Sequence, residues 1–306
     1  MIMKIRIEYN KEAQHLFYLS HLSSWGFPPC VETYKKIWIK ETGPLSKKEE
    51  EILNNLQEIF KEMDLRGKSI NFHITGNKKK GEIWKSLKEN VDKNQVREIK
   101  DALDAFKERF DLLWDKDKER LKKINTEIKK RARSKNALKS LRALEILFGG
   151  KIESFTIHLF AIPEKSGNLA GGADTEHKKI AREIRGTNDA KEALPVALHE
   201  LSHHLIKNLD LNLKEGERKS LKSLPLSKHL GLEGAWEELI LLTLLPHGAL
   251  SPHKTSRENE KETLEDFISR EMREEVKKYL KEEKVLDQEF ADEVLRKCEK
   301  FAKITL

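Results

Sequence analysis

Cysteines and long apolar runs are scarce in this chain. Cys30 and Cys298 are the only cysteines among 306 residues, and two positions so far apart predict no disulfide framework. No stretch approaches eighteen consecutive apolar residues, so we expect no transmembrane helix and no membrane partner. Residues 1–9 alternate like a strand and do not resemble a signal peptide. The expected location is therefore the cytoplasm.

Internal repeats and low-complexity linkers are also lacking, whereas charge is abundant. Charged residues make up 36% of the chain and hydrophobic residues 38%, which predicts a soluble protein with a highly charged surface. A chain of 306 residues can form one elaborate domain or two modest ones. Gly149-Gly150 is the best boundary, with a mostly helical region with short strands at 1–150 and a second domain at 151–306.

Hydrophobic periodicity predicts a predominantly helical α+β fold with a small mixed sheet. Before the boundary we expect helices at 11–23, 46–63, 81–89, 95–130 and 136–147, and strands at 3–9, 36–40 and 69–75. The long charged segment is expected to break near 114–117, and Ser46 with Glu49 matches a capping box. Beyond the boundary we expect a strand at 154–162, a loop at 167–172, a strand or short helix at 179–184, and helices at 190–209, 232–246, 261–283 and 287–303.

The motif that carries chemistry is His199-Glu200-Leu201-Ser202-His203, an H-E-x-x-H. Histidines four residues apart lie on one face of a helix, so both imidazoles can reach a single ion. Catalytic zinc takes three protein ligands and keeps an open position for water. Glu200 would then accept the proton of that water as it attacks a carbonyl. The pattern therefore predicts metal-assisted hydrolysis, most often of a peptide bond.

The apolar residues around the motif support a helix. Leucines and alanines recur at helical spacing within 190–209, which would bury one side and leave the histidines facing a cleft. Pro195 suggests that this helix begins close to it, with Thr187, Asn188 or Asp189 as caps for an earlier start. The alternative is a charged surface helix whose histidines bind nothing.

The third ligand decides the class of metal site. A metzincin would require glycine and a ligand where this chain has Ile206 and Leu209, so that class is excluded. A second helix, 232–246, is strongly apolar after an acidic start and is ended by Pro246. Buried carboxylates are costly unless they are compensated by metal coordination or a histidine partner. This helix therefore offers the missing ligand.

Over residues 154–246 the chain resembles the gluzincin metallopeptidases, which pair an H-E-x-x-H helix with a downstream glutamate helix. Glu233-Gly234-Ala235 is similar to their E-G-x-A pattern, and Glu233 with Glu237 matches the spacing of their N-E-x-x-x-D pattern. The resemblance implies a zincin-like catalytic domain with Zn²⁺ held by His199, His203 and Glu233, and with Glu237 orienting His199. Glu237 or Glu238 remains an alternative third ligand.

The resemblance also implies a tyrosine or histidine that stabilises the oxyanion, and a strand that edges the cleft and pairs with peptide. Downstream candidates for the oxyanion role are His247, His253 and Tyr279, although a loop role for the histidines and a packing role for the tyrosine are favoured over it. The segments 154–162 and 179–184 are the candidate edges. His204 points away from His203 and is expected to pack rather than bind metal.

A basic segment gives a second line of interpretation. Residues 121–140 contain eight lysines and arginines against Glu127, a stripe that could bind phosphates of a nucleic acid. A solvated helix face is the simpler interpretation, because interleaved aromatic residues are lacking. The leading hypothesis is thus a zinc metallopeptidase acting on a peptide or protein substrate. The alternative is a catalytically inactive metal-containing binding protein of the same fold.

Overall fold

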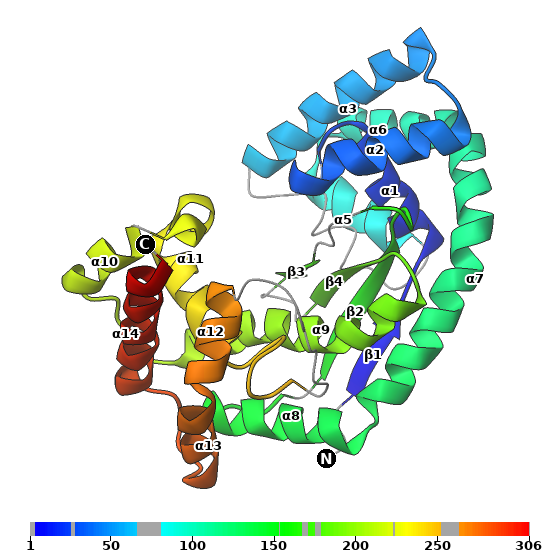
Figure 1. Cartoon of the computed structure of the whole chain (residues 1–306). Helices are drawn as coiled ribbons and strands as arrows, with labels where there is room; N and C mark the ends of the chain where they lie inside the picture. The colour runs from blue at the N-terminus through cyan, green and yellow to red at the C-terminus, as the bar shows by residue number, and fades with distance from the viewer. Residues whose placement is uncertain are drawn as a thin grey trace. The chain divides into compact units, whose positions relative to one another are not determined.

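The structure, a computed structural model, describes residues 4–25, 28–65, 81–152, 154–166, 171–174, 179–222, 224–251 and 263–305. It is predominantly helical with a small sheet, as the sequence predicts (Figure 1). No helix among the described residues is long and apolar enough to cross a membrane. The predicted strand at 69–75, His253 and most of the predicted loop at 167–172 lie outside the described residues.

Along the chain, helices separate the first strand from the second, and further helices follow the last strand. The strands are β1 (Lys4–Glu8), β2 (Ser154–Ala161), β3 (Gly171–Asp174) and β4 (Lys179–Ile184). The helices before β2 are α1 (Lys11–Leu22), α2 (Pro28–Thr42), α3 (Lys47–Leu65), α5 (Glu82–Asn90), α6 (Lys93–Ala105), α7 (Lys107–Ala132) and α8 (Lys135–Leu147). Those after β4 are α9 (Ala190–Leu205), α10 (Glu215–Lys222), α11 (Pro225–Leu242), α12 (Leu264–Glu271), α13 (Arg273–Lys281) and α14 (Gln288–Thr305).

The chain forms two compact units that are interleaved in sequence. One unit combines residues 1–4, 130–154 and 191–306, and the other combines 5–129 and 155–190. We call them the histidine-helix unit and the sheet unit, because the first contains nearly all of α9 and the second contains the strands. Each unit takes residues from both sides of Gly149-Gly150, the boundary expected from the sequence.

The sheet unit is built on a mixed sheet of strand order β1-β2-β4-β3. β2 pairs in parallel with β4, with Ile157 opposite Ile180, and β3 runs antiparallel to β4. Nearly all of β2 is buried, as expected of a strand covered on both faces. Helix α1 packs on one face through Phe17, whose ring stacks on that of Phe160 at 4.6 Å. Helices α2, α3 and α6 contact α1 in turn.

Two of the predicted elements in the sheet unit are wrong. Residues 36–40 belong to helix α2 and not to a strand: Val31, Tyr34 and Trp38 are buried at helical spacing. The predicted long charged helix breaks at Phe106, the C-cap of α6, rather than near 114–117. The ambiguous segment 179–184 is a strand, β4.

The predicted capping box at the start of α3 is present, and Arg109 binds to it. We call the contacts of Ser46, Glu49 and Arg109 the clamp. Ser46 N and Oγ donate to Glu49 Oε2 at 2.7 and 2.8 Å, and Glu49 N donates back to Ser46 Oγ. Arg109 on α7 donates to both oxygens of Glu49 and to the carbonyls of Thr42, Gly43 and Pro44. Burial disfavours the charged carboxylate, but the Arg109 and Ser46 bonds outweigh it and lower the pKa of Glu49 to about 2.

This clamp predicts a pH-dependent contribution to stability. A carboxyl with a depressed folded-state pKa stabilises the fold above its unfolded pKa, and that contribution is lost as the pH falls towards the folded value. We therefore expect Glu49→Gln to lower the free energy of unfolding by about 2 kcal/mol at pH 7. The difference in free energy of unfolding between the variant and the unmodified protein should become smaller as the pH falls from 4.5 to 2. Denaturant unfolding across this range measures it, with the exposed Glu50→Gln as control. A difference in free energy of unfolding that stays constant with pH would contradict this prediction.

Candidate metal site in the histidine-helix unit

Helix α9 presents the H-E-x-x-H motif. A short 3₁₀ turn, Thr187–Asp189, precedes it, and the helix begins at Ala190, so the structure takes the earlier of the two predicted starts. Pro195 lies inside the helix, beyond the first turn. In the first turn the N–H groups have no partner within the helix, so proline would be tolerated there. One face is buried through residues that recur at helical spacing: Ala193, Leu194, Ala197, Leu198, Leu201 and Leu205. This buried stripe fixes the rotation of the helix, and thereby the direction of both histidines.

His199 is the most buried member of the motif and is oriented by the backbone. Its side chain is 8% exposed, and its Nδ1 lies 3.0 Å from the carbonyl oxygen of Leu245. A carbonyl only accepts, so Nδ1–H is the donor. In the neutral ring, the lone pair is then on Nε2. A backbone carbonyl that binds the other nitrogen is the usual partner of a metal-ligating histidine.

Glu238 on α11 lies between the two histidines. Its Oε1 lies 3.3 Å from His199 Nε2, and its Oε2 lies 3.1 Å from His203 Nε2. The two rings are nearly perpendicular, with centroids 5.0 Å apart. The ligand atoms of the three residues all lie within 4.8 Å of one another. One helix therefore supplies two nitrogens and a second helix supplies a carboxylate that faces both.

These separations fit zinc. Ligand atoms at about 2.05 Å from a tetrahedral ion lie about 3.3 Å from each other. The two nitrogen–oxygen distances, 3.3 and 3.1 Å, are close to that edge length. Because Nε2 of neutral His199 carries a lone pair, it would repel the facing carboxylate oxygen unless a proton or a metal ion lay between them. Either a proton on His199 or a metal ion would remove this repulsion.

The charges of the cluster stabilise one another. Burial disfavours both charged forms, but the two histidines outweigh it at Glu238 and lower the pKa of its carboxyl to about 2. Burial likewise opposes protonation of His199, yet the Glu238 hydrogen bond and charge, with that of Glu200, raise the pKa of its imidazole. The carboxylate is therefore ionised throughout the neutral range, as a metal ligand must be.

Glu233 does not join the two histidines, which corrects the assignment drawn from the E-G-x-A resemblance. Its side chain is 65% exposed, and its Oε1 lies 2.7 Å from Arg218 Nη1. Helix α11 is interrupted at Gly231, which has a φ of 74°, so Glu233 falls in the exposed first turn after that break. Five residues later, Glu238 points about 140° away around the helix, toward the histidines. It was one of the two alternatives that the sequence left open.

Glu237 does not orient His199, which is the second correction. The three-residue cluster includes Glu238 and not its neighbour, and the carbonyl of Leu245 takes the role expected of Glu237. Sequence reasoning missed this carbonyl because a backbone group leaves no residue signature. The signal available was the Pro246-His247-Gly248 turn that follows the helix.

The loop that carries this carbonyl is tightly packed at Gly248. A Cβ on Gly248 would lie 2.5 Å from the carbonyl carbon of Leu244 and closer still to the carbonyl oxygen of Thr243. The loop is also closed by bonds from Ala249 N to Thr243 O and from Leu250 N to Leu244 O, both 3.0 Å. Only glycine fits this backbone approach.

We expect Gly248→Ala to displace the loop and loosen His199. The free energy of unfolding should fall by about 3 kcal/mol, because backbone atoms must move to admit the methyl group. Zinc affinity should fall about tenfold, as for loss of a histidine's outer partner. Thermal unfolding and zinc titration measure the two effects. Gly216→Ala in α10, where a Cβ meets nothing within 4 Å, should change neither by much. Equal effects of the two substitutions would refute the packing argument.

The three candidates for oxyanion stabilisation lie in different surroundings, and one of them is outside the described residues. Tyr279 is buried in α13 and donates to Asp287 Oδ1 at 2.6 Å, while Asp287 also accepts from Phe290 N at the start of α14. Its hydroxyl is thus engaged in joining two helices. His253 lies outside the described residues. His247 is half-buried and lies two residues beyond Leu245, in the loop that contacts His199. His247 remains the candidate for this role.

The basic segment 121–140 forms parts of two helices and not one stripe. Helix α7 ends at Ala132, and Ser134 caps α8, accepting from Ala137 N. Leu121, Ile124 and Ile128 are buried at helical spacing, while the lysines between them are exposed. This pattern is that of a solvated amphipathic helix face.

Comparisons with known proteins provide no relative. No protein-family model matches the chain, and no significant match was found among curated proteins or solved structures. Among the residues that the structure describes, His199, His203 and Glu238 form the group of side chains spaced to hold a metal ion. Any functional assignment therefore depends on the chemistry of this cluster.

Proposed function

We propose that the protein is a zinc-dependent hydrolase that cleaves peptide bonds, similar in its site to the gluzincins. The observation that carries the proposal is Glu238, which approaches His199 and His203 from a second helix at the spacing of a tetrahedral site. An H-E-x-x-H alone can arise by chance. A half-buried carboxylate that meets both histidines is an independent requirement of the same chemistry.

Each residue has a distinct role in the proposed reaction. His199 and His203 offer Nε2 and Glu238 offers its carboxylate, leaving Glu200 outside the ligand set. A bound zinc ion would polarise the substrate carbonyl and acidify a water molecule. Glu200 is half-buried and follows His199 directly on α9, and its charge contributes to raising the pKa of that imidazole. Its carboxylate accepts the proton of the attacking water and delivers it to the leaving nitrogen.

The exposure of the cluster supports catalysis over a purely structural role. Structural zinc sites are usually closed by four protein ligands, whereas catalytic sites use three. The side chains of His203 and Glu238 are 25% and 18% exposed, so solvent reaches the site from the His203 side. A protein that used the metal only as a fold element would gain nothing from this access or from a retained Glu200.

Metal analysis combined with a peptidase assay tests the proposal. The purified protein should contain about one zinc per chain, measured by mass spectrometry of the metal, and should cleave members of a quenched fluorescent peptide library. A chelator should abolish cleavage, and added zinc should restore it. Failure to bind zinc would refute the metal site. Zinc binding without cleavage of any peptide would favour the inactive metal-containing binding protein.

A further inference from the structure

The end of α7 and most of α8 carry a concentration of positive charge in the histidine-helix unit (Figure 1). Residues 130–144 contain six lysines and arginines and no acidic residue. We call these side chains the basic corner: Lys130, Arg131, Arg133, Lys135, Lys139 and Arg142. None of them belongs to the cluster of His199, His203 and Glu238, so a role for the basic corner goes beyond the proposed function.

Most of the basic corner is exposed, and much of its charge has no acidic partner. Four of its side chains are exposed and make no ion pair with a carboxylate among the residues that the structure describes: Lys130, Arg133, Lys135 and Lys139. Like charges four residues apart on a helix repel each other, as in the pair Lys135 and Lys139. The fold therefore leaves this charge for solvent or for an external anion.

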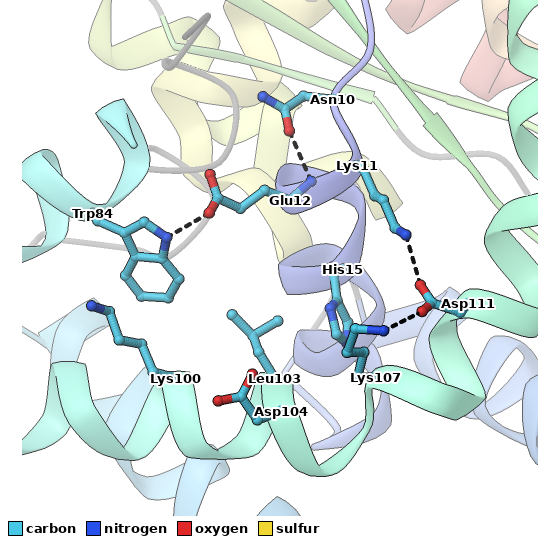
Figure 2. A pocket seen from close by; sticks show the side chains of 10 residues that line it. All are labelled: Asn10, Lys11, Glu12, His15, Trp84, Lys100, Leu103, Asp104, Lys107 and Asp111. Carbon is cyan, nitrogen blue, oxygen red and sulfur yellow. Dashed lines mark hydrogen bonds and ion pairs between the residues drawn. The ribbon is translucent and has the colours of Figure 1, made fainter. Parts of the chain in front are cut away.

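Several lysines outside the basic corner are paired within the protein. On α13, Lys277 Nζ lies 2.6 Å from Glu274 Oε1. In the sheet unit, Lys11 and Lys107 both contact Asp111 at 2.7 Å, on the wall of a cavity of about 600 Å³ (Figure 2). The chain has 52 acidic residues, yet none of them lies between residues 128 and 144. Acidic residues are thus plentiful, but the sequence places none within the basic corner.

The cations on α8 are spaced along one face of the helix. Lys135, Lys139 and Arg142 are separated by four and then three residues, so they extend over about 10 Å of the helix axis. A strand of nucleic acid carries one phosphate charge per about 3.4 Å of its axis, so this row can contact several phosphates of the same backbone. A small free anion could contact only one or two of these cations. The row therefore matches a polyanion with closely spaced charges.

The remaining surface of the basic corner favours nucleic acid over other polyanions. A helix that binds an anionic membrane inserts a broad apolar face, whereas that face of α8 is buried within the protein. Leu138 is 48% exposed, which is a single apolar side chain and not a face. Protein interfaces are enriched in aromatic residues and depleted in lysine, but residues 130–147 contain no aromatic residue. Single strands also require aromatic side chains for base stacking, which leaves the double helix.

We propose that the basic corner binds the phosphate backbone of double-helical nucleic acid without reading the bases. The row of cations on α8 contacts one strand, and Arg142, now 3.3 Å from Glu145, exchanges this carboxylate for a phosphate. Lys130 and Arg133 add charge from the end of α7 and from the turn that follows it. Contacts with phosphates carry no sequence information, so the affinity depends on salt and not on sequence.

Fluorescence anisotropy with the full chain tests the class of ligand. The probes are two labelled DNA duplexes of unrelated sequence, an RNA duplex and a single-stranded DNA. The two DNA duplexes should bind saturably, with affinities within about twofold of each other. Four or five phosphate contacts predict that the logarithm of the affinity falls with the logarithm of the salt concentration with a slope of about −4. Whichever of the DNA and RNA duplexes binds more tightly identifies the source of the backbone.

Four results would overturn the proposal. They are a lack of saturable binding by every duplex at low salt, an affinity that does not change with salt, tighter binding of the single strand than of any duplex, and binding to phosphatidylserine vesicles in place of the duplexes.

A pair of charge-matched variants tests whether the basic corner is the binding surface. Lys135→Gln combined with Lys139→Gln should weaken duplex binding about tenfold and reduce the salt slope by about two, one for each lost phosphate contact. Lys277→Gln combined with Lys278→Gln is the control, because these exposed lysines of α13 are paired with glutamates and the change in net charge is the same. The control should keep the affinity within about twofold. Thermal unfolding checks that both variants are folded. Equal losses of affinity in the two variants would show attraction to the whole protein and would overturn the proposal.

Discussion

Replacing Glu238 by glutamine is expected to lower the affinity of the protein for zinc by more than about a hundredfold. Loss of an outer partner of a ligand already costs tenfold to a hundredfold, and a direct ligand costs more. The substitution removes the one negative charge that faces both histidines. The amide can still donate to one Nε2, so the fold should survive. Competition with a chromogenic chelator measures the affinity, and thermal unfolding without metal checks the fold.

Glu233→Gln is the matched control for this prediction. Both glutamates lie on α11, but Glu233 is exposed and paired with Arg218. An exposed ion pair contributes little to stability, so this variant should retain zinc affinity within about twofold. The reverse result, with zinc lost from the Glu233 variant and kept by the Glu238 variant, would restore the assignment that the sequence pattern favoured.

Glu200→Gln is expected to lower kcat/KM for peptide hydrolysis by about a thousandfold while zinc remains bound. General acid–base catalysis by a positioned side chain typically contributes a hundredfold to ten-thousandfold. Glutamine has nearly the same shape as glutamate, yet it cannot accept the proton of the attacking water. The measurement pairs steady-state kinetics on a cleaved peptide with metal analysis of the same preparation.

Glu192→Gln serves as the control for Glu200 because it is a half-buried glutamate on the same helix, two turns before it. This variant should keep both zinc and activity. If Glu200→Gln retained full activity with zinc bound, Glu200 would have no part in proton transfer. If it lost zinc as well, its role would be to hold the histidines in place.

The elements around the site could be predicted from the sequence, but the glutamate that faces the two histidines could not. Periodicity located α9, whereas α11 was predicted at 232–246 from its apolar composition and the proline after it; the helix is Pro225–Leu242. Which of Glu233, Glu237 and Glu238 faces the histidines depends on the orientation of α11 about its own axis. That orientation changes at Gly231, where the backbone leaves the helical conformation. A positive φ at a glycine inside an apolar segment leaves no periodic signal. Motif similarity therefore favoured the residue that is exposed.

Errors elsewhere had a similar origin in tertiary packing. Residues 36–40 contain β-branched and aromatic side chains, which favour a strand locally. Trp38 instead packs in a buried aromatic cluster with Tyr18 and Tyr34. Tyr34 and Trp38 are four residues apart, so they lie on the same face of a helix. The partner of His199 was unpredictable for another reason: it is a carbonyl brought close by a loop 46 residues away.

The interleaving of the two units sets an order for folding during synthesis. The sheet unit is complete once residue 190 has emerged from the ribosome, whereas the histidine-helix unit needs residues from 191 onward to join 130–154. In that unit Leu286 N bonds to Leu147 O and Ser140 Oγ bonds to Leu250 O, so α8 must wait for partners more than a hundred residues downstream. A fragment that begins at residue 151 would lack α8 altogether. His199, His203 and Glu238 therefore come together last, on a unit whose first segment is synthesised well before its core can close.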